Sequence, residues 1–460
     1  MAHNLKCHFA GLFILILTAG DLCAANKFDV REFGAAGDGQ TLDTVAIQKA
    51  IDACAKAGGG EVHLPPGRFL SGTIRLRSGV TFHLEAGSRL VGTTNLSEYS
   101  QPHPPESLTE AKWGKWHRAL IVGENADDVM ICGSGIIDGN KVFDPTGEEK
   151  MRGPHAINLL NCHRFVLRDV TILDAANYGV YAQISDDLEF RNVKIVGGWD
   201  GIHWRGGPDQ WCHNVKIINC QLSTGDDAIA GRYWANTVIQ DCLLNSSCNG
   251  IRLIGPATGL SIVNNFFRGP GEQPHRSSGH RTNMLCAIML QPGAWDQTRG
   301  LLDAVFVANN AVENVASAFT LASKPGNTVG SVLVDGLRAT GVYGPAIAVE
   351  SWADSPLANV ILRDVHVAYA GGGKAWPDDR KVRPMGVDVG PLPAWGLYAR
   401  NVKNLTLQDV RFDVVSNDFR PVVRADEVER LDLDNVRFPR IAEVADPIVT
   451  NQVGVVLREP

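Results

Sequence analysis

Short segments in which apolar and polar residues alternate recur along most of the chain. Each ends in a turn residue, and the first of these are Asp169, Asn192, Asn219, Asp241 and Asn264. The pattern returns after about 22 to 27 residues, which is typical of a β-solenoid coil and too short for a propeller blade. Alternation places one face of each strand in a core. We therefore predict an all-β fold, a right-handed parallel β-helix whose turn Asn and Asp residues stack from coil to coil.

One segment near the N-terminus has helical periodicity instead. Its apolar residues share one face and are Ile47, Ala50, Ile51 and Cys54. Asp43 or Thr44 can cap the start of this helix, and Gly58 can end it. We predict a helix near Thr44–Ala57 that covers the open end of the solenoid. No linker divides the chain further, so residues 26–460 are expected to form a single β-helix domain.

Residues 1–25 have the three regions of a signal peptide. Lys6 supplies a positive charge, GLFILILTAG is a short apolar run, and Cys23-Ala24-Ala25 is a small-residue cleavage site. The apolar run is too short to span a bilayer. We expect a secreted or periplasmic protein without a membrane span, and a buried N-terminal helix is the alternative.

The charge and the cysteines narrow the possible partners. A net charge of −7 leaves no basic field for nucleic acid. Eight cysteines remain after cleavage; Cys212 with Cys220, or Cys242 with Cys248, could form disulfides. Several cysteines follow a turn Asn or Asp, as Cys162 does, which favours small buried residues stacked inside the solenoid. Because no Cys-x-x-Cys pair occurs, we expect no structural zinc site, and no metal or other cofactor.

Carboxylates occupy corresponding positions on neighbouring coils. Asp200, Asp227 and Asn249 each lie two residues before an apolar strand residue. Coils about 4.8 Å apart would stack these three in a column. Asp226 lies beside the column, and although strict alternation would turn it to the opposite face, the adjacent Gly225 can relax this. Clustered carboxylates raise at least one pKa and leave an acid beside ionised bases, the division that glycoside cleavage requires.

The sequence resembles glycoside hydrolase family 28, the polygalacturonase family, within the pectin-lyase-like β-helix superfamily. The resemblance starts at FDVREFGAAGDGQTLDTVAIQKAIDAC and GGGEVHLPPGRF and centres on WDGI and GDDAIA, which contain Asp200, Asp226 and Asp227. It implies an inverting hydrolase of a pectin-like polysaccharide or oligosaccharide. In that mechanism Asp226 is the general acid, and Asp200 and Asp227 position the water. We expect a monomer.

Two departures from the family pattern affect the substrate. The Gly-His-Gly motif reads Cys248-Asn249-Gly250, and the Arg-Ile-Lys motif falls near Met289-Leu290-Gln291. A Met and a Gln cannot bind a galacturonate carboxylate, although Arg252 could substitute. A neutral sugar, or an acidic sugar whose carboxylate is placed differently, is therefore an equal alternative to polygalacturonate as the substrate.

Further residues are candidates for substrate binding because they lie close to the carboxylates in sequence. These candidates are Asn249, Arg252, His203, Trp204, Arg232, Gln291 and Trp295. About two of five nearby tryptophans are expected to line a groove, since Trp is rarely fully buried; the five are Trp199, Trp204, Trp211, Trp234 and Trp295. Three long insertions are expected to shape the groove, namely Glu106–Arg118, Arg268–Asn283 and Gly371–Pro393. Most charges in the second insertion, such as Arg276, His280 and Arg281, are expected to be solvated.

Two other functions fit the same residues. A polysaccharide lyase would hold Ca²⁺ on Asp200, Asp226 and Asp227 and use Arg252 as its base. A non-catalytic carbohydrate-binding β-helix would bind sugar without needing these carboxylates. The clustering of three aspartates argues against the second alternative, because unneutralised charge costs stability unless it is used or paired.

Overall fold

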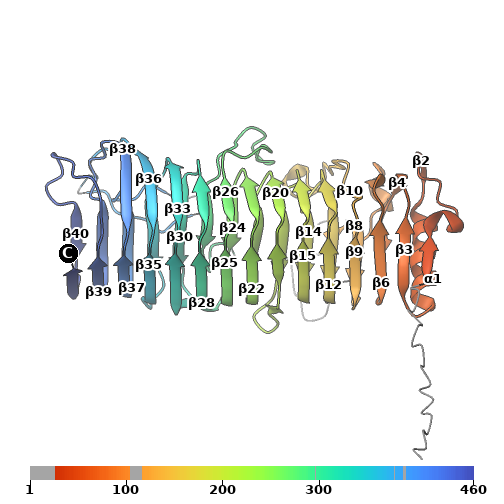
Figure 1. Ribbon diagram of the computed structural model, residues 1–460, viewed down its shortest axis with the longest axis horizontal. Coiled ribbons are helices and arrows are strands. Elements are labelled where there is room, and N and C mark those ends of the chain that lie inside the picture. Colours follow the sequence, from red (N-terminus) through yellow and green to blue (C-terminus); the bar gives the residue numbers. More distant parts are fainter. Residues whose placement is uncertain (1–25, 104–116, 296, 378, 387–389, 460) are drawn as a thin grey trace, which may run out of the picture.

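The computed structural model describes residues 26–103, 117–295, 297–377, 379–386 and 390–459 (Figure 1). It is a parallel β-helix whose strands form three long ladders. The predicted signal peptide and most of the first insertion lie outside the described residues. Within the described residues, no helix is long and apolar enough to cross a membrane.

The first ladder carries the carboxylates. Its strands are β5 (Ile74–Arg75), β8 (Ala119–Glu124), β11 (His155–Leu160), β14 (Val180–Gln183), β17 (Ile202–Arg205), β21 (Ile229–Arg232), β24 (Asn249–Leu253), β27 (Cys286–Leu290), β30 (Ser317–Ser323), β34 (Ile347–Ser351), β37 (Leu397–Gln408), β39 (Val423–Asp434) and β40 (Ile448–Asn451). Neighbours pair in parallel at successive coils, as β17 does with β21.

The second ladder follows the first around each coil, and β37 and β39 are long enough to belong to both. Its other strands are β1 (Lys27–Asp29), β3 (Gly60–Leu64), β6 (Val80–Leu84), β9 (Val129–Cys132), β12 (His163–Arg168), β15 (Asp186–Arg191), β19 (Lys216–Ile218), β22 (Trp234–Gln240), β25 (Ala257–Val263), β28 (Gly300–Ala308), β32 (Ser331–Asp335), β35 (Leu357–Arg363) and β41 (Val455–Glu459). Two short strands join it, β18 (Cys212–His213) and β31 (Asn327–Val329).

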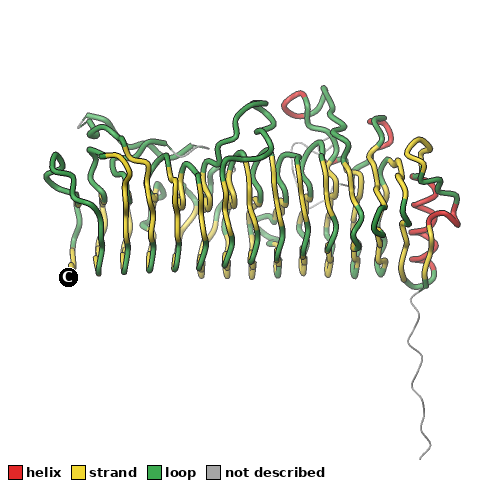
Figure 2. Tube along the Cα trace, turned by 45° about the horizontal axis from the view of Figure 1, so that its top comes forward, coloured by secondary structure: helices red, strands yellow, loops and turns green. Residues whose placement is uncertain are grey.

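The third ladder forms a separate sheet. Its strands are β2 (Asp38–Leu42), β4 (Gly67–Ser71), β7 (Ser88–Gly92), β10 (Ile136–Asp138), β13 (Thr171–Leu173), β16 (Lys194–Val196), β20 (Gln221–Thr224), β23 (Leu243–Ser246), β26 (Phe266–Arg268), β29 (Ala311–Glu313), β33 (Arg338–Val342), β36 (His366–Gly371) and β38 (Arg411–Ser416). Figure 2 shows long loops rising from one edge of the stacked coils.

The helix α1 (Thr44–Lys56) covers one end of the solenoid, as predicted (Figure 1). Its buried residues are the predicted apolar face, Ile47, Ala50, Ile51 and Cys54. The helix ends before Gly58, whose φ of 91° is left-handed. The predicted side-chain cap from Asp43 is wrong. Its carboxylate instead accepts from the backbone N–H groups of Ala36 and Gly37, so it fixes the preceding loop rather than the helix.

The predicted turn ladder is present. The five turn residues Asp169, Asn192, Asn219, Asp241 and Asn264 all have positive φ, a conformation that Asn and Asp tolerate. Nδ2 of Asn192 donates to Oδ1 of Asp169 over 2.9 Å, and Nδ2 of Asn219 donates to Oδ1 of Asn192 over 2.7 Å. Each amide therefore satisfies a polar group of the coil before it.

The core is built from stacked apolar residues inside the three ladders. Ile202, Ile229, Ile251 and Ile288 follow one another in register and are fully buried. The eight cysteines of the described residues are all buried and free, which confirms the stacking interpretation over the proposed disulfides. Consistent burial along each strand fixes the register, because a slip by one residue would turn every apolar side chain to solvent.

Candidate active site

The predicted column of polar residues forms where the first ladder begins on each coil. Pairing of Ile202 with Ile229, and of Ile229 with Ile251, places Asp200, Asp227 and Asn249 on successive coils. The backbone continues this register, because Gly201 N–H donates to the carbonyl oxygen of Asp227. Asn249 then donates to Asp227 Oδ1 twice, from Nδ2 over 2.7 Å and from the backbone N–H over 3.1 Å.

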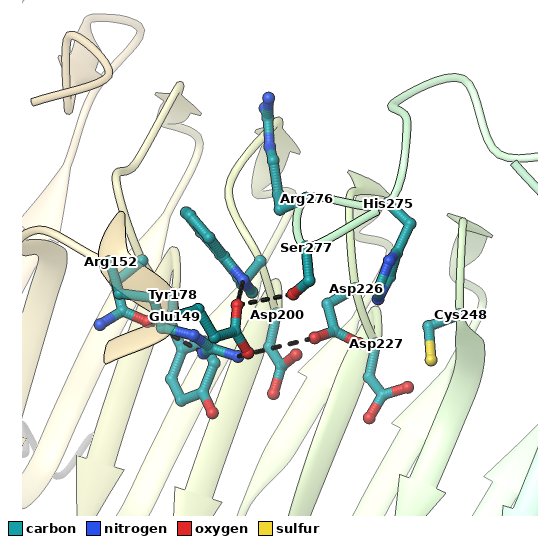
Figure 3. A network of polar contacts seen from close by, with 12 residues as sticks. Glu149, Arg152, Tyr178, Asp200, Asp226, Asp227, Cys248, His275, Arg276 and Ser277 are labelled. Atoms are coloured by element: carbon teal, nitrogen blue, oxygen red, sulfur yellow. Dashed lines mark hydrogen bonds and ion pairs between the residues drawn. The ribbon is translucent and has the colours of Figure 1, made fainter. Parts of the chain in front are cut away.

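Asp226 lies beside this column and its carboxylate joins the others. Strict alternation would have separated Asp226 from Asp227, but both residues precede β21 and are not part of the strand. Ligand atoms of Asp226, Asp227 and Cys248 all lie within 4.8 Å of one another. Figure 3 shows the carboxyl groups of Asp200, Asp226 and Asp227 on the same side of the strands.

Burial and mutual repulsion determine the protonation of the cluster. Asp200 is 4% exposed, and the pKa of its carboxyl is raised well above its usual value, first by burial and then by the charges of Asp226 and Asp227. The pKa of Asp227 is raised to about 6, because burial outweighs the opposing effect of the Arg252 guanidinium. Because the pKa values of Asp200 and Asp227 are both raised, the cluster retains a proton at pH values where an isolated aspartate is ionised.

His203 orients Asp200. Its Nδ1 lies 2.6 Å from Asp200 Oδ2, and its Nε2 accepts a hydrogen bond from Nε of Arg205 over 2.7 Å. The pKa of His203 is lowered well below its usual value by burial and by the nearby arginines Arg205 and Arg232. The ring is therefore neutral and donates from Nδ1 to Asp200. Tyr178 stacks on the same ring, with centroids 4.8 Å apart.

A polar network above the carboxylates was not predicted from the sequence (Figure 3). Glu149 Oε1 lies 2.9 Å from Arg152 Nη2, which is 3.9 Å from Asp226 Oδ2. Glu149 also accepts hydrogen bonds from Trp199 Nε1 (3.0 Å) and from Ser277 Oγ (2.6 Å). Glu149 belongs to a short 3-10 helix, Glu148–Lys150, between two coils. No repeat position marks these residues, and Ser277 lies 128 residues from Glu149, so only the fold brings them together.

The second insertion, Arg268–Asn283, folds over the carboxylates. Backbone N–H of Arg276 donates to Gly225 O, and its Nε donates to Gly198 O, both over 3.1 Å. The expectation that Arg276 is solvated is therefore wrong, and burial lowers the pKa of its guanidinium. His275 points toward Asp226 (Figure 3), and the charge of Asp226 partly offsets the lowering of its pKa by burial.

Comparison with known proteins supports this architecture. Residues 129–272 match the family described as "Right handed beta helix region", and residues 27–91 match "Rhamnogalacturonase A/epimerase, pectate lyase-like". A probable polygalacturonase from Vitis vinifera is 30% identical over 225 residues, which are 45% of this chain and 44% of the relative. This chain is therefore similar to polygalacturonases, at low identity. The predicted right-handed parallel β-helix is confirmed.

Further relatives show how far the similarity extends. The polygalacturonase-like chain is 26% identical over 292 residues to an exo-poly-α-D-galacturonosidase from Dickeya chrysanthemi, covering 52% of this chain and 45% of the relative. It spans less than half the length of both curated relatives. The structure of the family 28 exopolygalacturonase from Yersinia enterocolitica superposes with a TM-score of 0.58 at 18% identity, over 95% of this chain and 79% of that chain. At that identity the superposition establishes the fold alone.

Among the binding candidates of this polygalacturonase-like chain, Arg252 has unused donors. It is 3% exposed, and its Nη1 lies 3.9 Å from Asp227 Oδ2. Its guanidinium lies 5.4 Å from the ring centre of Trp295, which is 61% exposed. Within the part of the chain that the structure describes, its Nε and Nη2 have no hydrogen-bond partner. A buried guanidinium with free donors beside an exposed aromatic ring is suited to an anionic sugar.

Two of the other binding candidates, Trp204 and Gln291, are buried and have structural contacts. Trp204 is fully buried in the core and stacks on Trp234 at 4.0 Å, so its prediction as a sugar-binding residue is wrong. Trp199 is also fully buried. Gln291 is fully buried, and its Nε2 donates to Gly386 O over 2.9 Å, which ties it to the third insertion. Arg232 remains half-buried at the end of β21, within electrostatic reach of His203.

The carboxylates offer a poor calcium site. Ca²⁺ takes six to eight oxygen ligands. The potential metal-ligand group that includes these aspartates consists of Asp226, Asp227 and Cys248, and one of its three ligand atoms is sulfur. The pKa of the Cys248 thiol is raised well above its usual value by burial, followed by the charges of the two aspartates. A neutral thiol is not a ligand for a hard cation, which disfavours the calcium-dependent lyase.

Proposed function

We propose that this chain hydrolyses glycosidic bonds of an acidic, pectin-related polysaccharide. The observation that carries the proposal is the convergence of three carboxyl groups, two of them with raised pKa values, on adjacent coils. Such a cluster holds both a proton and negative charge near neutral pH, the two components that glycoside hydrolysis requires. The polygalacturonases among its relatives support this reaction class.

The proposed roles follow from exposure. Asp226 is the most accessible of the three, with a side chain that is 20% exposed, and it acts as the general acid on the leaving oxygen. Asp200 and Asp227 are nearly buried on successive coils and position the attacking water; Asp227, whose pKa is about 6, is ionised above that pH and accepts a proton from the water. His203 keeps Asp200 oriented by donating from Nδ1.

Inversion is the proposed stereochemical outcome. Oxygens of Asp226 and Asp227 lie within 4.8 Å, a separation that alone would suit a retaining enzyme. Two carboxylates on neighbouring coils can hold one water between them, however, and that arrangement does not require the wide gap of other inverting enzymes. Proton NMR of the first-formed anomer tests this point, and a retained anomer would contradict the water-activating roles.

The arginines around the cluster favour an acidic sugar. Arg252 keeps unused donors in a buried position, and Arg205 and Arg232 add positive charge on the same ladder. A uronate carboxylate would satisfy these donors with charge-assisted hydrogen bonds. We propose that Arg252 replaces the missing Arg-Ile-Lys motif and that Trp295 stacks on the sugar face. Secretion, as the predicted signal peptide implies, would place the enzyme where such polymers occur.

The decisive experiment is digestion of a panel of pectic polysaccharides, followed by analysis of product size and chain ends. We expect new reducing ends without unsaturated sugars, and activity that persists after chelation. Unsaturated products lost on chelation would establish the lyase alternative. Asp226→Asn should be inactive, with Asp241→Asn on the turn ladder as the matched control. Sugar binding that survives in Asp226→Asn, while the wild type cleaves nothing, would establish a non-catalytic binding protein.

A further inference from the structure

Imidazoles and carboxylates also cluster far from the proposed active site, on the outer face of β3 and β6. His63 of β3 pairs in register with His83 of β6. Val62 and Leu64 of β3 are fully buried in the core, so Glu61 and His63 point outward between them. These strands lie in the second ladder near the capped end of the solenoid, several coils from β17 and β21 of the first ladder (Figure 1).

The distances within this cluster match those of metal ligands. Oε1 of Glu61 lies 3.6 Å from Nδ1 of His63 and 3.2 Å from Nδ1 of His83. Potential ligand atoms of the three residues all lie within 4.8 Å of one another. A tetrahedral Zn²⁺ with bonds of about 2.0–2.1 Å separates its ligand atoms by about 3.3 Å. An ion can therefore sit among these atoms after small side-chain adjustments.

His63 provides an independent indication of a ligand. Its side chain is only 8% exposed, and its Nδ1 has no hydrogen-bond partner among the described residues. The opposite ring nitrogen, Nε2, lies 2.9 Å from Oε2 of Glu85. A histidine that binds a metal through one nitrogen generally directs the other nitrogen at a carboxylate, which fixes the tautomer and the ring orientation. His63 has this arrangement, with Nδ1 directed at Glu61 and Nε2 at Glu85.

We propose that Glu61, His63 and His83 form a zinc site, with Glu85 orienting His63 and a water molecule in the fourth position. Two imidazoles favour zinc over calcium or magnesium, which prefer oxygen. Lys27 Nζ lies 3.8 Å from Glu61 Oε1, but its side chain is 55% exposed and is free to move away. The absence of a Cys-x-x-Cys motif argues only against zinc sites made of cysteines, so it does not bear on a site made of histidines and a glutamate. The bound ion would join the first coils beneath α1 and stabilise the capped end.

Calorimetric titration of the full chain with ZnCl₂, after chelator treatment, tests the site. We expect about one bound equivalent. His83→Gln should weaken binding by at least about 100-fold, and Glu85→Gln by about 10- to 100-fold, as for other residues that orient a ligand. His83 is 33% exposed, so its replacement should not disturb folding, and circular dichroism checks this. Zinc should raise the melting temperature of the wild type but not of His83→Gln.

His213→Gln is the matched control. Nδ1 of His213 lies 3.2 Å from Asp186 on the same ladder, so it is also a histidine beside a carboxylate, but it does not belong to either described metal-ligand group. Zinc affinity should be unchanged in this variant. The proposal is overturned if the wild type binds no zinc or if His83→Gln binds it as tightly. It is also overturned if Cys248→Ser, rather than His83→Gln, abolishes binding, since the ion would then occupy the aspartate cluster.

Discussion

Polar residues stack from coil to coil in two places in this protein, and the two stacks differ in the type of side chain that each residue contacts on the next coil. In the turn ladder, Asn192 donates to Asp169 and Asn219 donates to Asn192, so donors alternate with acceptors in contact with solvent. In the proposed active site, Asp200 stacks on Asp227 away from solvent, and carboxylate meets carboxylate. The same coil spacing thus produces a hydrogen-bonded ladder in one place and a cluster of mutually repelling carboxylates in the other.

The difference shows that the solenoid supplies register, while the residues placed in that register determine the electrostatics. A stacked amide donates a hydrogen bond to the side-chain oxygen of its neighbour and so contributes to stability. A stacked and buried carboxylate disfavours ionisation of its neighbour and raises its pKa. The column of the proposed active site ends at Asn249, which donates two hydrogen bonds to Asp227, as the amides of the turn ladder donate to their neighbours.

The largest expected effect is on turnover. Asp226→Asn keeps the shape of the side chain but removes its exchangeable acid proton, so the rate should fall by about 10²–10⁴-fold. Reducing-end release from polygalacturonate measures this change. Asp241→Asn, the same substitution in the turn ladder, should retain wild-type activity. Similar losses in both variants would contradict the functional distinction between the two stacks.

A smaller effect is expected at the anion-binding side of the site. Arg252→Gln should lower kcat/KM on polygalacturonate by about 10- to 100-fold, since a charge-assisted hydrogen bond contributes about 1.5–3 kcal/mol. As a control, Arg363→Gln removes an exposed arginine of β35 that pairs with Asp335 of β32, and it should have no effect on kcat/KM. An equal decrease of kcat/KM on a neutral pectic galactan would show that Arg252 acts on the aspartates of the site rather than on the carboxylate of the sugar.

The third prediction concerns stability and pH. The folded pKa of Asp227, about 6, lies above its ordinary value of 3.8. Its protonated form therefore favours the fold fully below about pH 4, and this contribution is lost as the pH rises through 6. Asp227→Asn should be inactive but more stable than the wild type at pH 7–8, on the order of 1–3 kcal/mol, and no more stable at pH 4. Denaturant unfolding across this range measures the difference, and a pH-independent difference would argue against a strained carboxylate.

The smallest effect is expected when a carboxylate replaces an amide in the turn ladder, so that the ladder comes to resemble the proposed active site. Asn192→Asp places a second carboxylate beside Asp169 and removes the donor between them. Both carboxylates lie near solvent, so the free energy of unfolding should fall by less than about 1 kcal/mol, and the decrease should be smaller at high salt. Thermal unfolding at low and high ionic strength measures it. A large, salt-independent loss would show that solvent exposure does not explain why the ladder and the cluster behave differently.

Much of the architecture was predictable because it is periodic. The recurring turn residues indicated the coil length, and alternation within each strand indicated which side chains enter the core. The apolar face of α1 followed from helical spacing alone. Asp200, Asp227 and Asn249 could be aligned because each has the same position relative to a buried strand residue. In each case the information is local, and in the coils it also repeats along the chain.

Other features could not be predicted because they depend on contacts between segments without a shared period. The exposure of Trp204 depends on its neighbour Trp234, which fills the core beside it. Asp43 was misassigned because its partners, the N–H groups of Ala36 and Gly37, precede the helix. Arg276 was expected in solvent, but carbonyl oxygens exposed by distant turns bind it.

The coil repeat, the capping helix and the column of carboxylates follow from patterns in the sequence, since hydrophobic burial selects a single register for every strand. The surroundings of that column depend on contacts that form when the whole chain folds. The contacts of Glu149 and Ser277 above Asp226 join parts of the chain that carry no common pattern. Burial, which raises the pKa values of Asp200 and Asp227, is likewise a property of the assembled coils and the loop that covers them, because desolvation depends on every atom that excludes water from a carboxylate.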